Sequence, residues 1–154
     1  MGGSVTNGRF AAVLIVVGGA AATLGSFTNW GYCSKEPCEG PGGLSHLFPV
    51  SGVDIGPGIP TALLGTFLVI AGIEAFRRGG ELPYRRAALV AAVGVVVIVA
   101  LWTIYYTLPP GSFFYGPGGD YVFVIPGGIL AAAGSFKLRE PGGSRRRGPP
   151  PIRR

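Results

Sequence analysis

The chain has 154 residues, of which 48% are hydrophobic and only 13% are charged, with a formal net charge of +6 and a mean hydropathy of +0.47. Soluble domains carry roughly 25% charged residues, so this chain has about half the ionisable groups expected of a water-covered surface. The composition excludes an ordinary soluble domain and predicts an integral membrane protein.

Four apolar stretches predict membrane-spanning helices, at residues 10–27, 55–76, 87–107 and 119–136. A bilayer core of about 30 Å requires about 20 helical residues. The fourth stretch is marginal in length, and Pro126 lies inside it and removes a backbone donor, so a kink is expected there. We expect an all-α, integral membrane four-helix bundle over residues 1–139, followed by a basic tail at 140–154.

The first stretch also fits a cleaved signal peptide, because Arg9 precedes an apolar run that contains the small residues Ala20 to Ala22. We favour a retained span, since the apolar run is long for a signal core. Cleavage would also leave an odd number of spans.

The basic residues predict the orientation. Of the 13 Lys and Arg residues, only Lys35 lies on the side of the membrane opposite to the others. Cytoplasmic loops are enriched in Lys and Arg, so both termini are expected in the cytoplasm, with the chain in the cell membrane. These charges flank spans, which predicts contact with anionic membrane lipid and no nucleic-acid partner. Trp30 and Trp102 close spans and are expected in the outer interfacial belt.

The first exterior loop holds both cysteines of the chain, Cys33 and Cys38. On the oxidising side of a membrane they are expected to form a disulfide that shapes a local turn. The alternatives are a redox pair or a metal site shared with His46. Redox pairs favour two intervening residues, and a lone His in such a loop is usually solvated.

Small residues recur at four-residue spacing in the first and fourth spans. Such ridges let helix backbones approach closely, either within the bundle or against a partner subunit. The predicted helix-packing residues are Gly18, Ala22, Ser26, Gly127, Ala131 and Ser135.

The second and fourth spans echo each other. A Gly-Pro-Gly triplet precedes each span, at 56–58 and 116–118, and glycines stand seven apart in both, at Gly65 and Gly72 and at Gly127 and Gly134. This pattern predicts two related helical hairpins, a repeat that some transporters show. Chance similarity between glycine-rich spans is the alternative.

Ionisable residues are absent from the middle of the predicted spans, where they would mark a functional site. Glu74 lies near Arg77 and Arg78 and is expected beside an Arg at the inner boundary, with proton-relay chemistry as the alternative. Asp54 and Asp120 stand near helix starts, where the helix dipole favours an acid. With a single His and no catalytic constellation, we expect no enzyme, no cofactor and no metal site.

The C-terminal tail combines proline with basic residues and cannot bury apolar area. It is expected to contact membrane lipid or an acidic partner surface. The cations concerned are Arg145, Arg146, Arg147, Arg153 and Arg154.

Several short runs resemble a group of small four-span membrane proteins of actinobacteria. They are residues 25–30 and 51–56, the Leu63-Leu64-Gly65 run and the basic Arg77-Arg78 loop. The resemblance covers most of the chain, and its motifs have low specificity. It implies a four-span fold and no established activity.

These observations predict an accessory or assembly subunit of a larger membrane complex. The alternative is a small oligomeric transporter or channel. Convergence of polar residues on one hydrated cavity would favour transport, and scattered, packed positions would favour the accessory role. The residues that distinguish the two are Thr61, Thr66, Thr103 and Glu74.

Overall fold

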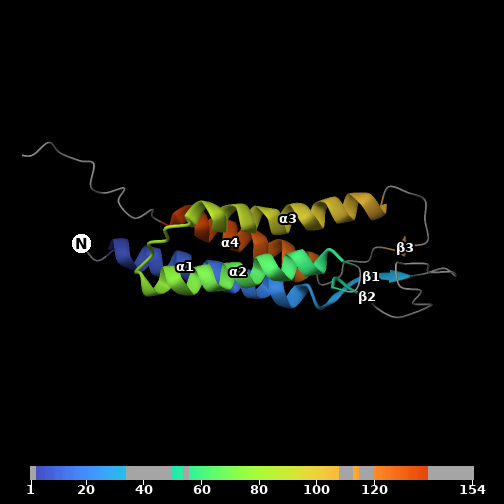
Figure 1. Cartoon of the computed structure of the whole chain (residues 1–154), viewed down its shortest axis with the longest axis horizontal. Coiled ribbons are helices and arrows are strands. Elements are labelled where there is room, and N and C mark those ends of the chain that lie inside the picture. The colour runs from blue at the N-terminus through green and yellow to red at the C-terminus, as the bar shows by residue number, and fades with distance from the viewer. Residues whose placement is uncertain (1–2, 34–49, 54–55, 108–112, 115–119, 139–154) are drawn as a thin grey trace, which may run out of the picture.

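The computed structural model describes residues 3–33, 50–53, 56–107, 113–114 and 120–138. Four helices lie alongside one another and form an elongated bundle (Figure 1). They are α1 (Gly3–Gly25), α2 (Gly58–Arg77), α3 (Arg85–Thr107) and α4 (Ile125–Lys137). Each helix packs against two others in the cyclic order α1, α2, α3, α4, and α1 makes the most extensive contacts.

Three of these helices are long and apolar enough to cross a membrane, over Thr6–Gly25, Gly58–Arg77 and Arg85–Ile104. In lipid, a helix satisfies all its backbone hydrogen bonds internally, so these runs stay helical despite their many glycines and β-branched residues. Large apolar side chains point outward along the bundle, as at Leu24 (69% exposed), Leu63 (67%) and Val90 (71%). Such a surface is suited to lipid and excludes an ordinary water-exposed protein.

The fourth helical segment is a shorter apolar helix, Val122–Lys137, and contains a change of helix type. A π-helix, η1 (Asp120–Val124), leads directly into α4, and Pro126 stands in the first turn of α4. Proline has no N–H to donate, so a regular α-helical ladder cannot run through this point. The change from π-helical to α-helical hydrogen bonding falls beside Pro126, and the expected kink stays a prediction.

The end of α2 is a glycine-dependent cap. The Gly80 amide donates to the Ala75 carbonyl (2.8 Å) and the Gly79 amide to the Phe76 carbonyl (3.2 Å), which is the Schellman pattern. Gly79 adopts φ +67° and Gly80 φ +97°. A Cβ on Gly80 would also lie 2.4 Å from the Cα of Gly8, so this turn presses closely on the start of α1.

A small sheet lies at the opposite end of the bundle from this turn (Figure 1). Strand β1 (Asn29–Cys33) pairs antiparallel with both β2 (Val50–Ser51) and β3 (Phe113–Phe114), in the order β2-β1-β3. The sheet was not expected from the sequence. It joins the end of α1 to segments that precede α2 and η1, and we call this end the sheet end.

The other end of the bundle carries every Lys and Arg whose position the structure describes. They are found at the start of α1 and α3 and at the end of α2 and α4, and we call this end the basic end. The six residues are Arg9, Arg77, Arg78, Arg85, Arg86 and Lys137.

Candidate functional site

Helix α1 packs closely against both α4 and α2, because two adjacent glycines of α1 each contact a different one of these helices. A Cβ on Gly18 would lie 2.3 Å from the carbonyl oxygen of Gly127 on α4. A Cβ on Gly19 would lie 2.7 Å from the carbonyl oxygen of Gly65 on α2. At both contacts the backbones approach more closely than any side chain would allow.

The other predicted helix-packing residues are also buried. Ala22, Ser26, Ala131 and Ser135 are each 0% exposed. Ser26 Oγ donates to the Ala22 carbonyl (2.8 Å), so its polar atom is satisfied on its own helix. Ser135 Oγ is buried without a hydrogen-bond partner in the part of the chain that the structure describes. The structure thus brings the α1 and α4 ridges together inside the bundle.

The two glycine pairs that stand seven residues apart both face α1. On α2, a Cβ on Gly72 would meet Val16 and Ala12, two turns along from the Gly65 contact. On α4, a Cβ on Gly134 would lie 2.6 Å from the Ala11 carbonyl oxygen. If the α1–α2 and α3–α4 hairpins were related by a two-fold axis, the glycine pair of α4 would face α3, as the pair of α2 faces α1. The glycine spacing therefore reflects the packing of α2 and α4 on one shared helix.

The threonines of the spans are satisfied locally. Thr61 Oγ1 donates to the Pro57 carbonyl (2.8 Å), and Thr66 and Thr103 donate in the same way to carbonyls four residues earlier (both 2.9 Å). Thr61 is buried and Thr66 is exposed, so the hydroxyls do not share one surface. None of the three lines any of the grooves described below.

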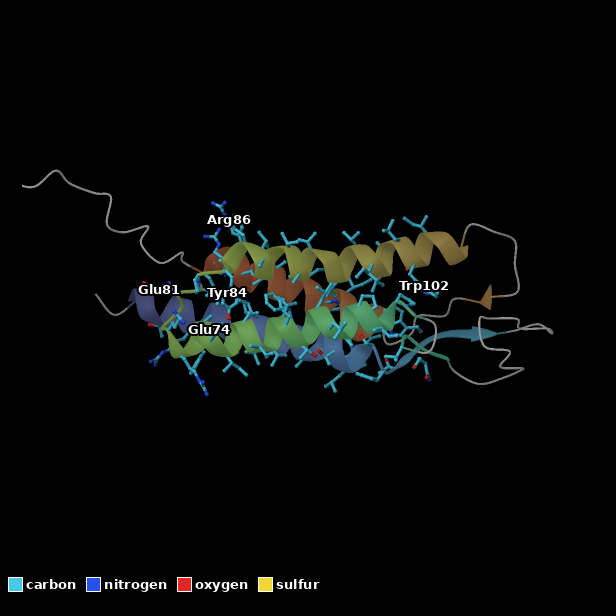
Figure 2. All side chains as sticks on the ribbon, in the orientation of Figure 1. Glu74, Glu81, Tyr84, Arg86 and Trp102 are labelled. Atoms are coloured by element: carbon cyan, nitrogen blue, oxygen red, sulfur yellow. The ribbon has the colours of Figure 1, made fainter. Side chains whose placement is uncertain are left out.

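Glu74 lies at the basic end in a small polar cluster (Figure 2). Arg78 Nη2 forms an ion pair with Glu74 Oε1 at 2.7 Å, and Tyr84 Oη donates to Glu74 Oε2. The expected Arg neighbour of Glu74 is confirmed. The Tyr84 ring also packs against Phe67, with centroids 6.1 Å apart. The cluster ties α2 to the turn that precedes α3, and both Glu74 oxygens are engaged.

Among the residues that the structure describes, no group of three His, Cys, Asp or Glu side chains could hold a metal ion.

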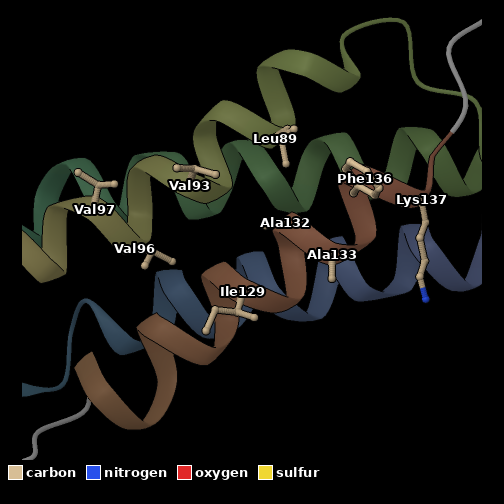
Figure 3. Close-up of a pocket in the computed structure, with 9 residues that line it drawn as sticks. All are labelled: Leu89, Val93, Val96, Val97, Ile129, Ala132, Ala133, Phe136 and Lys137. Atoms are coloured by element: carbon tan, nitrogen blue, oxygen red, sulfur yellow. The ribbon is translucent and has the colours of Figure 1, made fainter.

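An outward-facing apolar groove of about 580 Å³ lies between α3 and α4 (Figure 3). We call it the α3/α4 groove. Apolar side chains line its length, and Lys137 stands at its basic end beyond Phe136. The lining residues are Leu89, Val93, Val96, Val97, Ile129, Ala132, Ala133, Phe136 and Lys137.

Two smaller grooves lie near the end of α2. One, of about 430 Å³, includes Glu74, Arg77 and Arg78 among its lining residues. The other, of about 270 Å³, runs between α1 and α2 beside Phe76. The Arg9 guanidinium stands 5.6 Å from the Phe76 ring centroid, a cation–π contact that joins the two helices.

Several predicted residues lie outside the described part of the chain. Cys33 ends β1, but its side chain and the whole of Cys38 are outside it, as are His46 and Asp54. Asp120 opens η1, as expected for an acid at a helix start. The tail cations Arg145, Arg146, Arg147, Arg153 and Arg154 also lie outside the described residues. The predicted disulfide and the predicted tail contact stay predictions.

Trp30, which the sequence predicts for the outer interfacial belt, is packed inside the protein at the sheet end. It is 0% exposed, and its indole Nε1 donates to the Gly25 carbonyl (2.8 Å). A Cβ on Gly52 would lie 2.3 Å from the Trp30 ring, so the glycine makes room for the indole. The pairing of β1 with β2 brings these two residues together, and no local signal predicts it.

Comparison with protein-family models, curated proteins and solved structures finds no match to this chain. The resemblance to small actinobacterial membrane proteins stays a prediction.

Proposed function

We propose that this chain is a non-catalytic accessory or assembly subunit of a larger membrane protein complex. The observation that carries the proposal is the separation of the polar side chains within the spans. Thr61, Thr66 and Thr103 each bond to their own helix, and Glu74 is engaged by Arg78 and Tyr84 at the basic end. They do not converge on a shared cavity, so the bundle offers surfaces to partners in preference to a path for a solute.

The packing around α1 supports the same proposal. The Gly18 and Gly19 contacts bring backbones of α4 and α2 against α1, which leaves little room for a channel between these helices. The described grooves are on the outside of the bundle, where neighbouring molecules in the membrane would lie. A small oligomeric transporter, the alternative, would have to build its path between copies of the chain.

The proposed orientation places the basic end at the cytoplasmic face of the cell membrane. Its support is the positive-inside rule, because the six described Lys and Arg residues all cluster at that end. The sheet end would then face the exterior, on the side where a Cys33 to Cys38 disulfide is stable.

The experiment is purification of the tagged full-length chain from its native membrane in a mild detergent. Native-gel sizing and mass spectrometry then identify the proteins that accompany it. Stoichiometric recovery of unrelated membrane subunits, reduced when the tail after Glu140 is deleted, is the expected result. A lone monomer or a homo-oligomer would overturn the proposal.

A further inference from the structure

The α3/α4 groove has the dimensions of a ligand site. Its volume of about 580 Å³ falls within the range of roughly 300 to 1,000 Å³ that is typical of small-molecule pockets. Ala132 and Ala133 form a shallow floor on α4, and the larger Ile129 and Phe136 stand on either side of them along the helix. The accessory role proposed above gives this groove no occupant.

Contacts on both sides of the groove hold it open. Toward the sheet end, Gly128 lets α4 approach α3 so closely that an added Cβ would lie 2.7 Å from Val96 Cγ2. At the basic end, Arg85 Nη1 donates to the Leu138 carbonyl at 3.1 Å. The two helices are fixed relative to each other at both points, so the hollow between them is preformed.

Charge distinguishes the two ends of the groove. Lys137 is exposed and has no ion-pair partner in the part of the chain that the structure describes. Arg85 and Arg86 begin α3 at the same end. Glu74 on α2 is already paired with Arg78. The groove therefore combines an apolar length with a cationic end.

We propose that this groove binds one acyl chain of an anionic phospholipid, with the lipid phosphate paired to the Lys137 ammonium. An acyl chain supplies apolar length, and the phosphate supplies a negative charge at headgroup depth, where Lys137 stands. Basic sites between membrane helices recognise anionic headgroups in this way. A neighbouring protein helix would match the apolar lining but would leave Lys137 without a counter-charge unless it carried a carboxylate at that depth.

The test uses the full-length chain in a neutral detergent. It is titrated with phosphatidylglycerol or with phosphatidylcholine, and bound lipids are counted by native mass spectrometry. The first phosphatidylglycerol should bind more tightly than the first phosphatidylcholine. Lys137→Gln should weaken that phosphatidylglycerol affinity about fivefold, the effect of one cation near an anionic lipid, and leave phosphatidylcholine unchanged. Arg77 is an exposed cation on α2 at the same end of the bundle. Arg77→Gln should change the affinity for neither lipid by more than about twofold.

A second pair of variants tests the apolar part. Ala133→Phe fills the groove from an exposed position, so the bundle should fold, and it should weaken the first lipid of either kind about tenfold. Val97→Phe repeats the test from α3, and Ala87→Phe, at an exposed α3 position that does not line the groove, is the matched control. The proposal would be overturned if Lys137→Gln and Arg77→Gln weakened phosphatidylglycerol affinity equally. It would also be overturned if both groove-filling variants left lipid binding unchanged. Displacement of a bound protein by Ala133→Phe, with lipid binding unchanged, would assign the groove to a partner helix.

Discussion

Gly18 and Gly19 are neighbours on α1, yet each allows a different helix to reach its backbone. The gaps that they leave are smaller than a methyl group, because an added Cβ would lie 2.3 Å and 2.7 Å from carbonyl oxygens of α4 and α2. Gly94 on α3 is different, since its Cβ would meet only Leu64 Cδ1 at 3.4 Å, an ordinary contact. A glycine's importance here depends on what faces it.

Gly18→Ala should therefore destabilise the bundle by about 1–3 kcal/mol, because the added methyl forces two backbones apart. Gly94→Ala is the matched control. It should be neutral or should stabilise the bundle by up to about 1 kcal/mol, because alanine has less conformational freedom than glycine in the unfolded chain. Thermal unfolding of both variants in the same mild detergent measures the difference. Equal melting temperatures for the two variants would show that the α1–α4 contact is looser than described.

Trp30 anchors the sheet end through its buried ring and its hydrogen bond to Gly25. Trp30→Ala removes a fully buried ring and its hydrogen bond to Gly25, and it should cost about 3–5 kcal/mol. Phe27→Ala is the control, because Phe27 is 60% exposed and packs mainly outward. Thermal unfolding in the same detergent measures both variants. If Trp30→Ala and Phe27→Ala have equal melting temperatures, Trp30 does not anchor the sheet end.

At the scale of elements, the helices were predictable and their arrangement was not. Apolar runs identified all four, although α1 begins at Gly3, before the expected start at Phe10, and α4 is preceded by a π-helix. Strands β2 and β3 are two residues each and pair with a segment far away in sequence, so they carry no periodicity to detect. The α3/α4 groove likewise depends on which faces of two helices meet, and hydropathy alone does not determine that.

The helices also differ in how firmly they are held. Within their apolar spans, 39% of α1 is buried inside the bundle, compared with 28% of α3. Helix α3 packs on the others through small buried side chains such as Ala88, Ala92 and Val95 and through a close approach at Gly128, whereas α1 meets both α2 and α4 through backbone contacts. The bundle is thus a tight α1–α2–α4 group with α3 less deeply packed.

Hydrogen–deuterium exchange in lipid nanodiscs tests this ranking. Amides in the middle of α3 should exchange faster than those in the middle of α1, because fewer buried contacts oppose local opening of α3. Comparing central residues of both helices controls for fraying at the helix ends. Slower exchange in α3 than in α1 would contradict the ranking.

At the scale of the whole molecule, charge and shape divide the bundle into two distinct ends. The basic end collects the six described Lys and Arg residues together with the Glu74 cluster, and the sheet end is closed by Trp30 and three short strands. Between them, the Ser26, Thr61 and Thr103 hydroxyls bond to carbonyls one turn earlier, and small residues fill the contacts between helices. The central claim is that this bundle offers outward surfaces and does not itself conduct a solute.

Liposome flux measures that claim most directly. The full-length chain is reconstituted at increasing protein-to-lipid ratios, and the release of protons, potassium or a small neutral solute is followed with time. The account predicts leak rates equal to those of protein-free liposomes at every ratio. Flux that rises with protein content would contradict it and favour the oligomeric transporter.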